Sequence, residues 1–313
     1  MRTAARLFVT ATAAIGAFAS TALLAQSPPT PGTPASGVPD SAASASAAAV
    51  SAARAAKQPA GPTPRLHNGK PDLSGLWANP YTPNMAAKDT VLDPATRKPL
   101  KTPGTELADA KPAAIGGGTR TLDLPYTPWG LKRWKNYDPV NDGDYAGSCL
   151  PFGMSRNINS PHGLQIVQND NAVALLFEQN TWFHWVPTNG AKWPADLPPS
   201  WNGVSTGHWE GDTLVIETTG FNGYTRLDTV GHPLSKQLKL INMFTRIDAR
   251  TIQHTVTVHD PKTYTQDWMN VRTWHLRPAS DVIMEYSCEE NNLDNLFSGA
   301  IKKWQPPEND DED

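Results

Sequence analysis

One stretch of the chain places acidic, amide, aromatic and imidazole side chains at every second position. On an unbroken strand, Glu178, Asn180, Trp182 and His184 point to the same side, because successive strand side chains alternate between faces. A few polar groups set among aromatic ones are typical of a ligand site. The row can equally be the solvent face of the strand. The pattern therefore leaves a ligand site and a solvated face as equal alternatives.

A histidine and a carboxylate also lie two positions apart, at His208 and Glu210. On a strand the two side chains share a face, and such a pair can act as a general base with the group that orients it. Glu210 also begins the sequence Glu-Gly-Asp, in which acidic residues favour a turn. Catalysis and turn formation both remain as interpretations, and the turn is favoured.

Glu285 lies in a segment that has the alternation of a strand, on the face opposite Cys288. A carboxylate in an apolar interior has a raised pKa and can act as a general acid. The favoured alternative is a structural ion pair with Arg272 or Arg246 on a neighbouring strand. The catalytic candidates are thus Glu178, His184, His208 and Glu285.

Tryptophan is the most unusual feature of the composition. The chain has 11 Trp, and five of them lie between residues 182 and 209. Aromatic faces bind flat or apolar ligands, although large barrels also need bulky core residues. We predict ligand contacts for a set of four from this cluster: Trp182, Trp185, Trp201 and Trp209.

The sequence predicts no metal and no cofactor. The eight His show no metal-binding spacing, and phosphate loops and dinucleotide fingerprints are absent from the sequence.

Strand-like segments separated by turn residues follow one another from Leu164 to Cys288. The expected hairpins include 204–209 with 213–218, 238–247 with 251–259, and 269–276 with 282–288. A long meander removes its exposed edges best by closing on itself. We predict an all-β fold, an antiparallel meander closing into a barrel at 149–304. An irregular wrapping segment at 64–148 precedes it, and a short helix at about 291–304 ends it.

The two ends of the chain have the composition of segments outside this domain. Residues 1–25 start with Arg2 and Arg6, continue with an apolar run, and predict a cleaved signal peptide. Residues 26–63 are rich in Ala, Ser and Pro and predict a disordered tether, and 305–313 form an acidic disordered tail. No later segment is apolar enough to span a bilayer, so we predict a periplasmic or secreted protein with no membrane span after signal cleavage. The net charge of −3 and the lack of a basic stripe argue against a nucleic-acid partner.

The chain contains two cysteines, Cys149 and Cys288, which are 139 positions apart. In an exported protein, two cysteines more often form a disulfide than remain as thiols. The chain-entropy model assigns a loop of this length about 4–5 kcal/mol of stabilisation. Two buried thiols are the less favoured alternative.

Several motifs over about 220 residues resemble a family of exported bacterial β-rich proteins of uncharacterised function. They are Asp72-Leu-Ser-Gly-x-Trp77, Cys149-x-Pro-x-Gly153, Trp201-x-Gly-x-Ser-x-Gly-x-Trp-x-Gly-Asp-Thr-Leu-Val215, Asp260-Pro-x-x-Tyr264 and Glu285-Tyr-x-Cys-x-Glu-Asn291. The resemblance implies no reaction. The chain departs from the family pattern at Leu234, where the family has His, and at Asn242-Met243, where it has Glu-Arg. The Gly75-x-Trp77 start followed by a meander also resembles lipocalin-type barrels, which implies a small-molecule cavity.

Two functions share this cavity. The first is an exported barrel that binds a small apolar or aromatic molecule. The second is an enzyme, a lyase, isomerase or hydrolase without a cofactor, that uses a Glu/His acid–base pair inside the barrel. A structural envelope protein without a cavity is a weaker third interpretation. The sequence does not identify the ligand or the oligomeric state.

Overall fold

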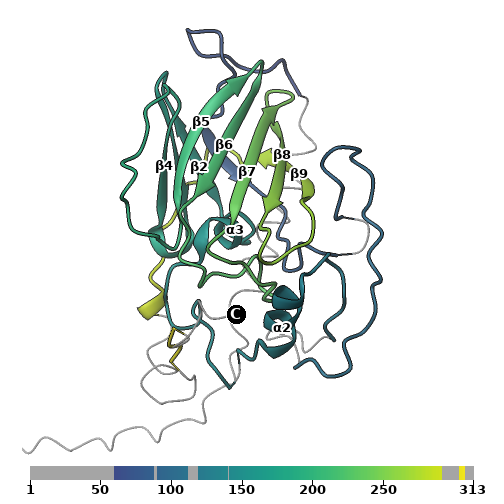
Figure 1. The fold of residues 1–313 in the computed structure, drawn as a ribbon. Helices are drawn as coiled ribbons and strands as arrows, with labels where there is room; N and C mark the ends of the chain where they lie inside the picture. The colour runs from purple at the N-terminus through teal and green to yellow at the C-terminus, as the bar shows by residue number, and fades with distance from the viewer. Residues whose placement is uncertain (1–59, 88–89, 112–118, 140, 291–302, 307–313) are drawn as a thin grey trace, which may run out of the picture. The chain divides into compact units, whose positions relative to one another are not determined.

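Nine strands pair side by side in one antiparallel sheet that curls into a nearly closed barrel (Figure 1). The structure is a computed structural model, and it describes residues 60–87, 90–111, 119–139, 141–290 and 303–306. These residues fall in one unit of the chain, Pro39–Asp313. The strands are β1 (Gly75–Ala78), β2 (Leu164–Gln168), β3 (Ala172–Phe177), β4 (Phe183–Pro187), β5 (Val204–Glu210), β6 (Thr213–Thr219), β7 (Lys239–Arg246), β8 (Thr251–His259) and β9 (Trp268–Leu276).

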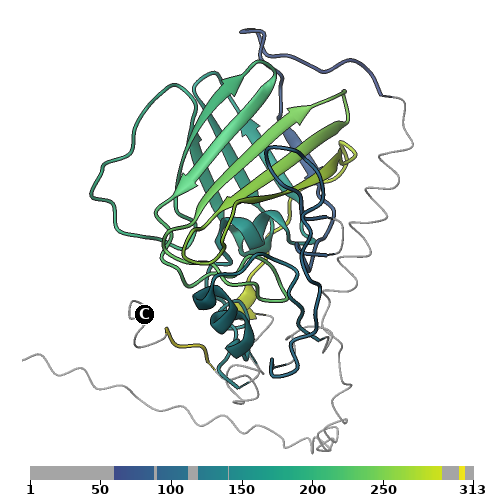
Figure 2. The ribbon, with the colours of Figure 1, turned by 45° about the vertical axis from the view of Figure 1, so that its right-hand side comes forward.

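The order of the strands in the sheet is β4-β3-β2-β1-β9-β8-β7-β6-β5. Strands that follow one another in sequence pair with each other, except for β4 and β5, and the last strand returns to the first, where Trp77 lies opposite Leu276. β4 and β5 are therefore the two edge strands, although they are consecutive in the chain. Figure 2 shows the resulting curved wall of strands. The predicted all-β meander barrel is confirmed.

Alternating burial along the strands defines the interior of the barrel. On β7, Leu240, Asn242, Phe244 and Arg246 are buried, and the residues between them are half-buried. The same alternation on β8 and β9 sends even-numbered residues inward. Because strand side chains alternate between faces, each strand contributes every second residue to the core. The interior is mainly aliphatic and aromatic, with a few polar residues that are considered below.

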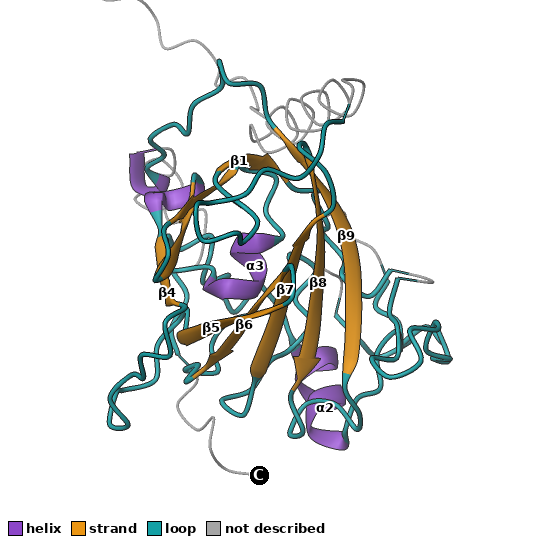
Figure 3. Ribbon diagram, turned by 90° about the horizontal axis from the view of Figure 1, so that it is seen from above, coloured by secondary structure: helices purple, strands orange, loops and turns teal. Residues whose placement is uncertain are grey.

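Two helices, α2 and α3, accompany the strands, in addition to short helical turns at residues 179–181 and 288–290. The helix α3 (Gly153–Ile158) is buried at every position, and the view down the barrel shows it within the ring of strands (Figure 3). The helix α2 (Pro128–Asn136) is capped by Thr127, whose hydroxyl accepts a hydrogen bond from the Gly130 N–H, and carries Pro at its first turn. Within the described part of the chain, none of the helices is both long and apolar enough to cross a membrane.

Two details of the predicted strands are wrong. The stretch from Glu178 to His184 is not an unbroken strand, because the 3₁₀ turn η1 (Gln179–Thr181) separates β3 from β4. Residues 282–287 form no strand, so the expected hairpin with 269–276 does not exist. The free edge of β9 is occupied by β1 instead, and the Arg277 N–H continues this contact by donating to the Leu76 carbonyl. The second half of the expected hairpin thus has no edge with which to pair.

Cys149 and Cys288 form the predicted disulfide, with their Cα atoms 5.5 Å apart. The bond joins the segment before α3 to the segment that follows β9. The expected signal peptide, most of the tether, most of the acidic tail and nearly all of the expected C-terminal helix lie outside the described residues. A disulfide fits an exported protein, because oxidising compartments preserve such bonds.

Candidate functional site

The predicted row of Glu178, Trp182 and His184 does not share one face. Glu178 has helical backbone angles at the start of η1, and this turn breaks the alternation between β3 and β4. His184 points into the barrel, where its Nε2 lies 2.6 Å from the Ser205 Oγ, and the Ser205 Oγ lies 2.6 Å from the Thr218 Oγ1. Burial lowers the pKa of His184 to about 4, so its imidazole is neutral at pH 7.

Glu178 has a different role. Its carboxylate accepts hydrogen bonds from the Gly163 N–H at 2.9 Å and from the Met284 N–H at 3.2 Å. Gly163 precedes β2, and Met284 lies in the segment after β9. The carboxylate thereby joins two segments that are far apart in sequence.

His208 and Glu210 contact each other, but on the solvent side of β5. The His208 Nε2 lies 3.1 Å from the Glu210 Oε1, and the side chains are 52% and 61% exposed. Ion pairs as exposed as this contribute little free energy. The two groups therefore meet as the sequence suggests, outside any enclosed site.

Glu285 is exposed, and its expected ion pair with Arg272 or Arg246 is wrong. Arg246 donates to backbone carbonyls, and Arg272 lies inside the barrel without an acceptor. The wrong strand assignment of 282–288 explains the error, because it placed Glu285 beside strands that it does not contact. The four catalytic candidates thus occupy four separate environments.

The four predicted ligand-contacting Trp residues also separate. Trp185 is 47% exposed, and Trp182 and Trp209 pack partly buried against the core. Trp201 stacks on Tyr145 with ring centroids 5.8 Å apart, in a cluster with Tyr224 and Trp304. Ligand contact by these residues stays a prediction.

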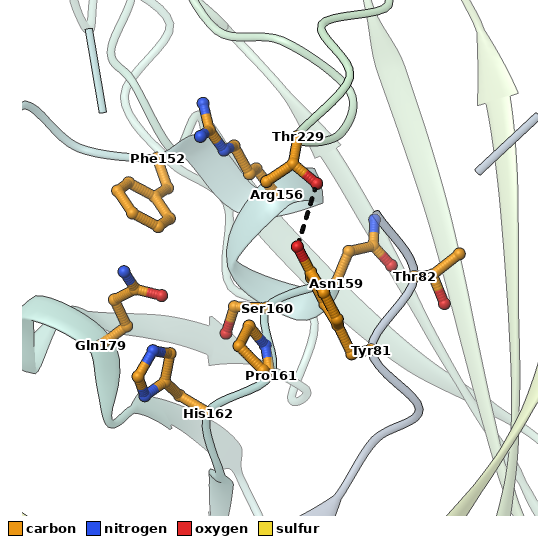
Figure 4. Close-up of a pocket in the computed structure, with 10 residues that line it drawn as sticks. All are labelled: Tyr81, Thr82, Phe152, Arg156, Asn159, Ser160, Pro161, His162, Gln179 and Thr229. Carbon is orange, nitrogen blue, oxygen red and sulfur yellow. Dashed lines mark hydrogen bonds between the residues drawn. The ribbon is translucent and has the colours of Figure 1, made fainter. Parts of the chain in front are cut away.

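A pocket of about 170 Å³ opens beside α3 (Figure 4). Its walls combine aromatic rings with short polar side chains. Figure 4 shows Phe152 on one side of the space, Gln179 and His162 on a second, and Tyr81 with Thr229 on a third. The lining residues are Tyr81, Thr82, Phe152, Arg156, Asn159, Ser160, Pro161, His162, Gln179 and Thr229.

Four segments that are distant in sequence build this pocket. Tyr81 and Thr82 follow β1, and residues 152–162 comprise α3 and its link to β2. Gln179 lies on η1, and Thr229 lies between β6 and β7, where its hydroxyl is 3.4 Å from the Tyr81 hydroxyl. None of these residues stood out in the sequence as a catalytic or ligand candidate, because no spacing rule connects them.

The start of α3 requires glycine. Gly153 has φ of +79°, and a Cβ at this position would lie 2.5 Å from the Thr225 Cγ2. A side chain would therefore be both strained and in collision. Gly153 permits α3 to enter the barrel directly after Phe152, and this entry places Phe152 and Arg156 in the pocket wall.

Burial and neighbouring charges set the electrostatics of His162 and Arg156 in the pocket wall. Burial lowers the pKa of His162, and the negative charge of Glu178 opposes this effect in part. Arg156 donates to both carboxylate oxygens of Asp144, at 3.3 and 3.2 Å, and its guanidinium lies 4.9 Å from the Phe152 ring centroid. Burial raises the pKa of Asp144, but the Arg156 charge and hydrogen bonds outweigh it and leave this pKa below its usual value.

The arrangement suits a small molecule with an apolar or aromatic body and one or two polar atoms. Phe152, Pro161 and the Tyr81 ring supply apolar contacts, and His162, Gln179 and Ser160 supply donors and acceptors.

Among the residues that the structure describes, no group of three or more His, Cys, Asp or Glu side chains is placed to hold a metal ion. Comparison with family models, curated proteins and solved structures gives no match. The resemblance to the exported β-rich family therefore stays a prediction.

Proposed function

We propose that this protein is an exported barrel that binds a small apolar or aromatic molecule in the pocket beside α3. The pocket is the observation that carries this proposal. It joins aromatic walls to a few polar side chains, which is the usual composition of small-molecule sites. It lies among segments held by the barrel and by the Cys149–Cys288 disulfide, so its walls are anchored before a ligand arrives.

The volume limits the ligand. Sites for drug-sized ligands occupy roughly 300–1,000 Å³, and this pocket has about 170 Å³. The ligand is therefore of the size of a single substituted ring. His162 is the polar group best placed to orient it, because burial favours its neutral form, which both donates and accepts a hydrogen bond.

The disulfide and the signal-like N-terminal sequence together support the periplasm or the exterior as the location. Oxidising compartments are where a structural disulfide persists. The location is testable by fractionation of cells that express the full chain. Recovery of the protein without residues 1–25 in the periplasm or the medium is the expected result.

The binding test uses phenol, benzyl alcohol and benzamide as probes, with thermal unfolding and ligand-observed NMR as readouts. Gln179→Trp fills the pocket with an indole from η1 and should abolish binding. Lys192→Trp places the same side chain at an exposed position and is the matched control. Binding of none of the probes to the wild type, or equal binding to both variants, would contradict the proposal.

General acid–base catalysis in the same pocket is the second candidate. The observation in its favour is that His162 lines the pocket within the electrostatic influence of Glu178. Such a site would serve a lyase, isomerase or hydrolase. His162→Gln keeps a polar side chain but removes proton transfer, so it should leave a binding protein nearly intact and inactivate an enzyme.

A further inference from the structure

Four arginines are buried among the described residues, and three of them have acceptors. Arg120 donates to the Trp134 and Tyr137 carbonyls, and Arg156 donates to Asp144. Arg246 projects into the barrel from β7, and its guanidinium is surrounded by acceptors. These are the backbone carbonyls of Asp72, Asp248 and Ala249.

Arg272 is the exception. It projects into the barrel from β9, is 8% exposed, and none of its Nε, Nη1 and Nη2 atoms has a hydrogen-bond partner. Burial lowers its pKa to about 10, so the guanidinium still carries its charge at pH 7. Leaving a charged group buried without a partner is strongly destabilising in general. None of the described residues around Arg272 supplies an acceptor for its guanidinium.

The neighbours of Arg272 add further unpartnered polar atoms. His254 lies opposite Arg272 in the β8–β9 register, and its Nε2 lies 3.0 Å from the Asn242 Oδ1. Because an amide oxygen only accepts, the Nε2 donates this hydrogen bond. The Asn242 Nδ2 and the Trp274 Nε1 are buried donors without partners. The guanidinium and indole donors on β9 and the amide donor on β7, the two strands that flank β8, thus have no acceptor among the described residues.

Aromatic rings flank these donors. The His254 ring contacts both Phe244 and Trp274, with centroid distances of 4.8 and 4.7 Å, and the Phe244 and Trp274 ring centroids are 5.4 Å apart. All three rings are at most 1% exposed. A planar anionic group here would contact apolar rings and face the guanidinium. Carboxylates match the two parallel N–H bonds of an arginine, which a spherical ion does not.

We propose that Arg272 is the anchor of a carboxylate-binding site inside the barrel, with Asn242 and Trp274 as additional donors. The occupant is a small organic acid. The site shares no residue with the lining of the pocket beside α3. It goes beyond the proposed function, and either site can exist without the other.

The test measures thermal unfolding of the wild-type chain while sodium formate, acetate or benzoate replaces sodium chloride at constant ionic strength. A ligand that binds only the folded state raises Tm, by about 5 °C or more at a hundredfold excess over its Kd for a domain of this size. Because the sodium chloride reference has the same ionic strength, an effect of ionic strength alone gives no shift. A wild-type Tm that is unaffected by all three carboxylates would overturn the proposal.

Three arginine variants assign the effect. Arg272→Met keeps the long stem but removes the unpaired charge, so it should abolish the carboxylate response without lowering Tm in chloride. Arg246→Met is the matched control, because Arg246 is a buried barrel arginine whose donors have acceptors, and it should lower Tm but keep the response. Arg272→Lys retains the charge without the paired donors and should weaken the response at least tenfold. A full carboxylate response in Arg272→Met would also overturn the proposal.

Discussion

The imidazole of His184 on β4 and the hydroxyl of Ser205 on β5 meet at 2.6 Å, between the two edge strands of the sheet. Ser205 is completely buried and also contacts the Thr218 hydroxyl on β6. The indole of Trp193 donates to the Ser205 carbonyl on the same edge. Side chains therefore connect β4 to β5 where the barrel has no ladder of backbone hydrogen bonds.

Ser205→Ala should destabilise the protein by about 1–3 kcal/mol, because it leaves the His184 and Thr218 polar groups buried without their shared partner. Urea denaturation monitored by Trp fluorescence measures the change. Thr206→Ala on the exposed face of the same strand is the control and should cost less than about 0.5 kcal/mol. Equal losses in the two variants would show that the contact between β4 and β5 contributes no specific stability.

Stability should fall as the pH is lowered from about 6.5 to about 4. The pKa of His184 is about 4 in the folded state and about 6.5 when unfolded, so the unfolded chain binds more protons in this window. The loss from this residue is at most about 1.4 kcal/mol per pH unit. Burial and the charge of Arg272 also lower the pKa of His254, which acts in the same direction.

Unfolding free energies of wild type and His184→Gln at pH 7, 6, 5 and 4.5 test this pH dependence. The variant should show a shallower decline, because glutamine does not titrate. His208→Gln is the control at an exposed position and should follow the wild type. A decline of equal slope in wild type and His184→Gln would contradict the assignment to His184.

Removal of the disulfide in Cys149→Ser/Cys288→Ser should cost about 4–5 kcal/mol in the chain-entropy model, because the bond closes a loop of 139 positions. The measurement is the urea midpoint of the variant against the oxidised wild type. Reduced wild type provides the internal comparison and should match the variant. A midpoint unchanged by both treatments would contradict the predicted contribution.

Gly130→Ala should destabilise the contact between α2 and the turn after β8 by about 1–3 kcal/mol. A Cβ at this position would lie 2.2 Å from the Thr263 carbonyl oxygen, so the helix would have to move. Gly147→Ala is the control, since its Cβ would meet only ordinary contacts at 3.5 Å. The measurement is the Tm of the two variants in thermal unfolding. A Gly130→Ala protein as stable as the wild type would show that α2 can shift away from the Thr263 carbonyl without loss of stability.

The wall of the barrel was predictable from local patterns. Turn residues such as Glu210-Gly211-Asp212 separate segments whose alternation matches a pleated sheet, and the hairpins β5–β6 and β7–β8 formed as expected. The pairing of Cys149 with Cys288 followed from count and compartment alone. The hairpins depend on residues that are neighbours in sequence. The disulfide was predictable because the chain has only two cysteines, which leaves one possible pair.

The sites depended on tertiary structure, because register and strand order decide which polar residues meet. The turn η1 reversed the expected face of Glu178, and the return of β9 to β1 left Glu285 in an exposed segment. From the sequence, Arg272 was one of two arginines expected to form an ion pair with Glu285. In the structure, Arg272 is buried opposite His254 instead. The sequence by itself thus determined a disulfide-linked β meander, and only its closure into a barrel decided which side chains are buried together, since burial depends on contacts between distant segments.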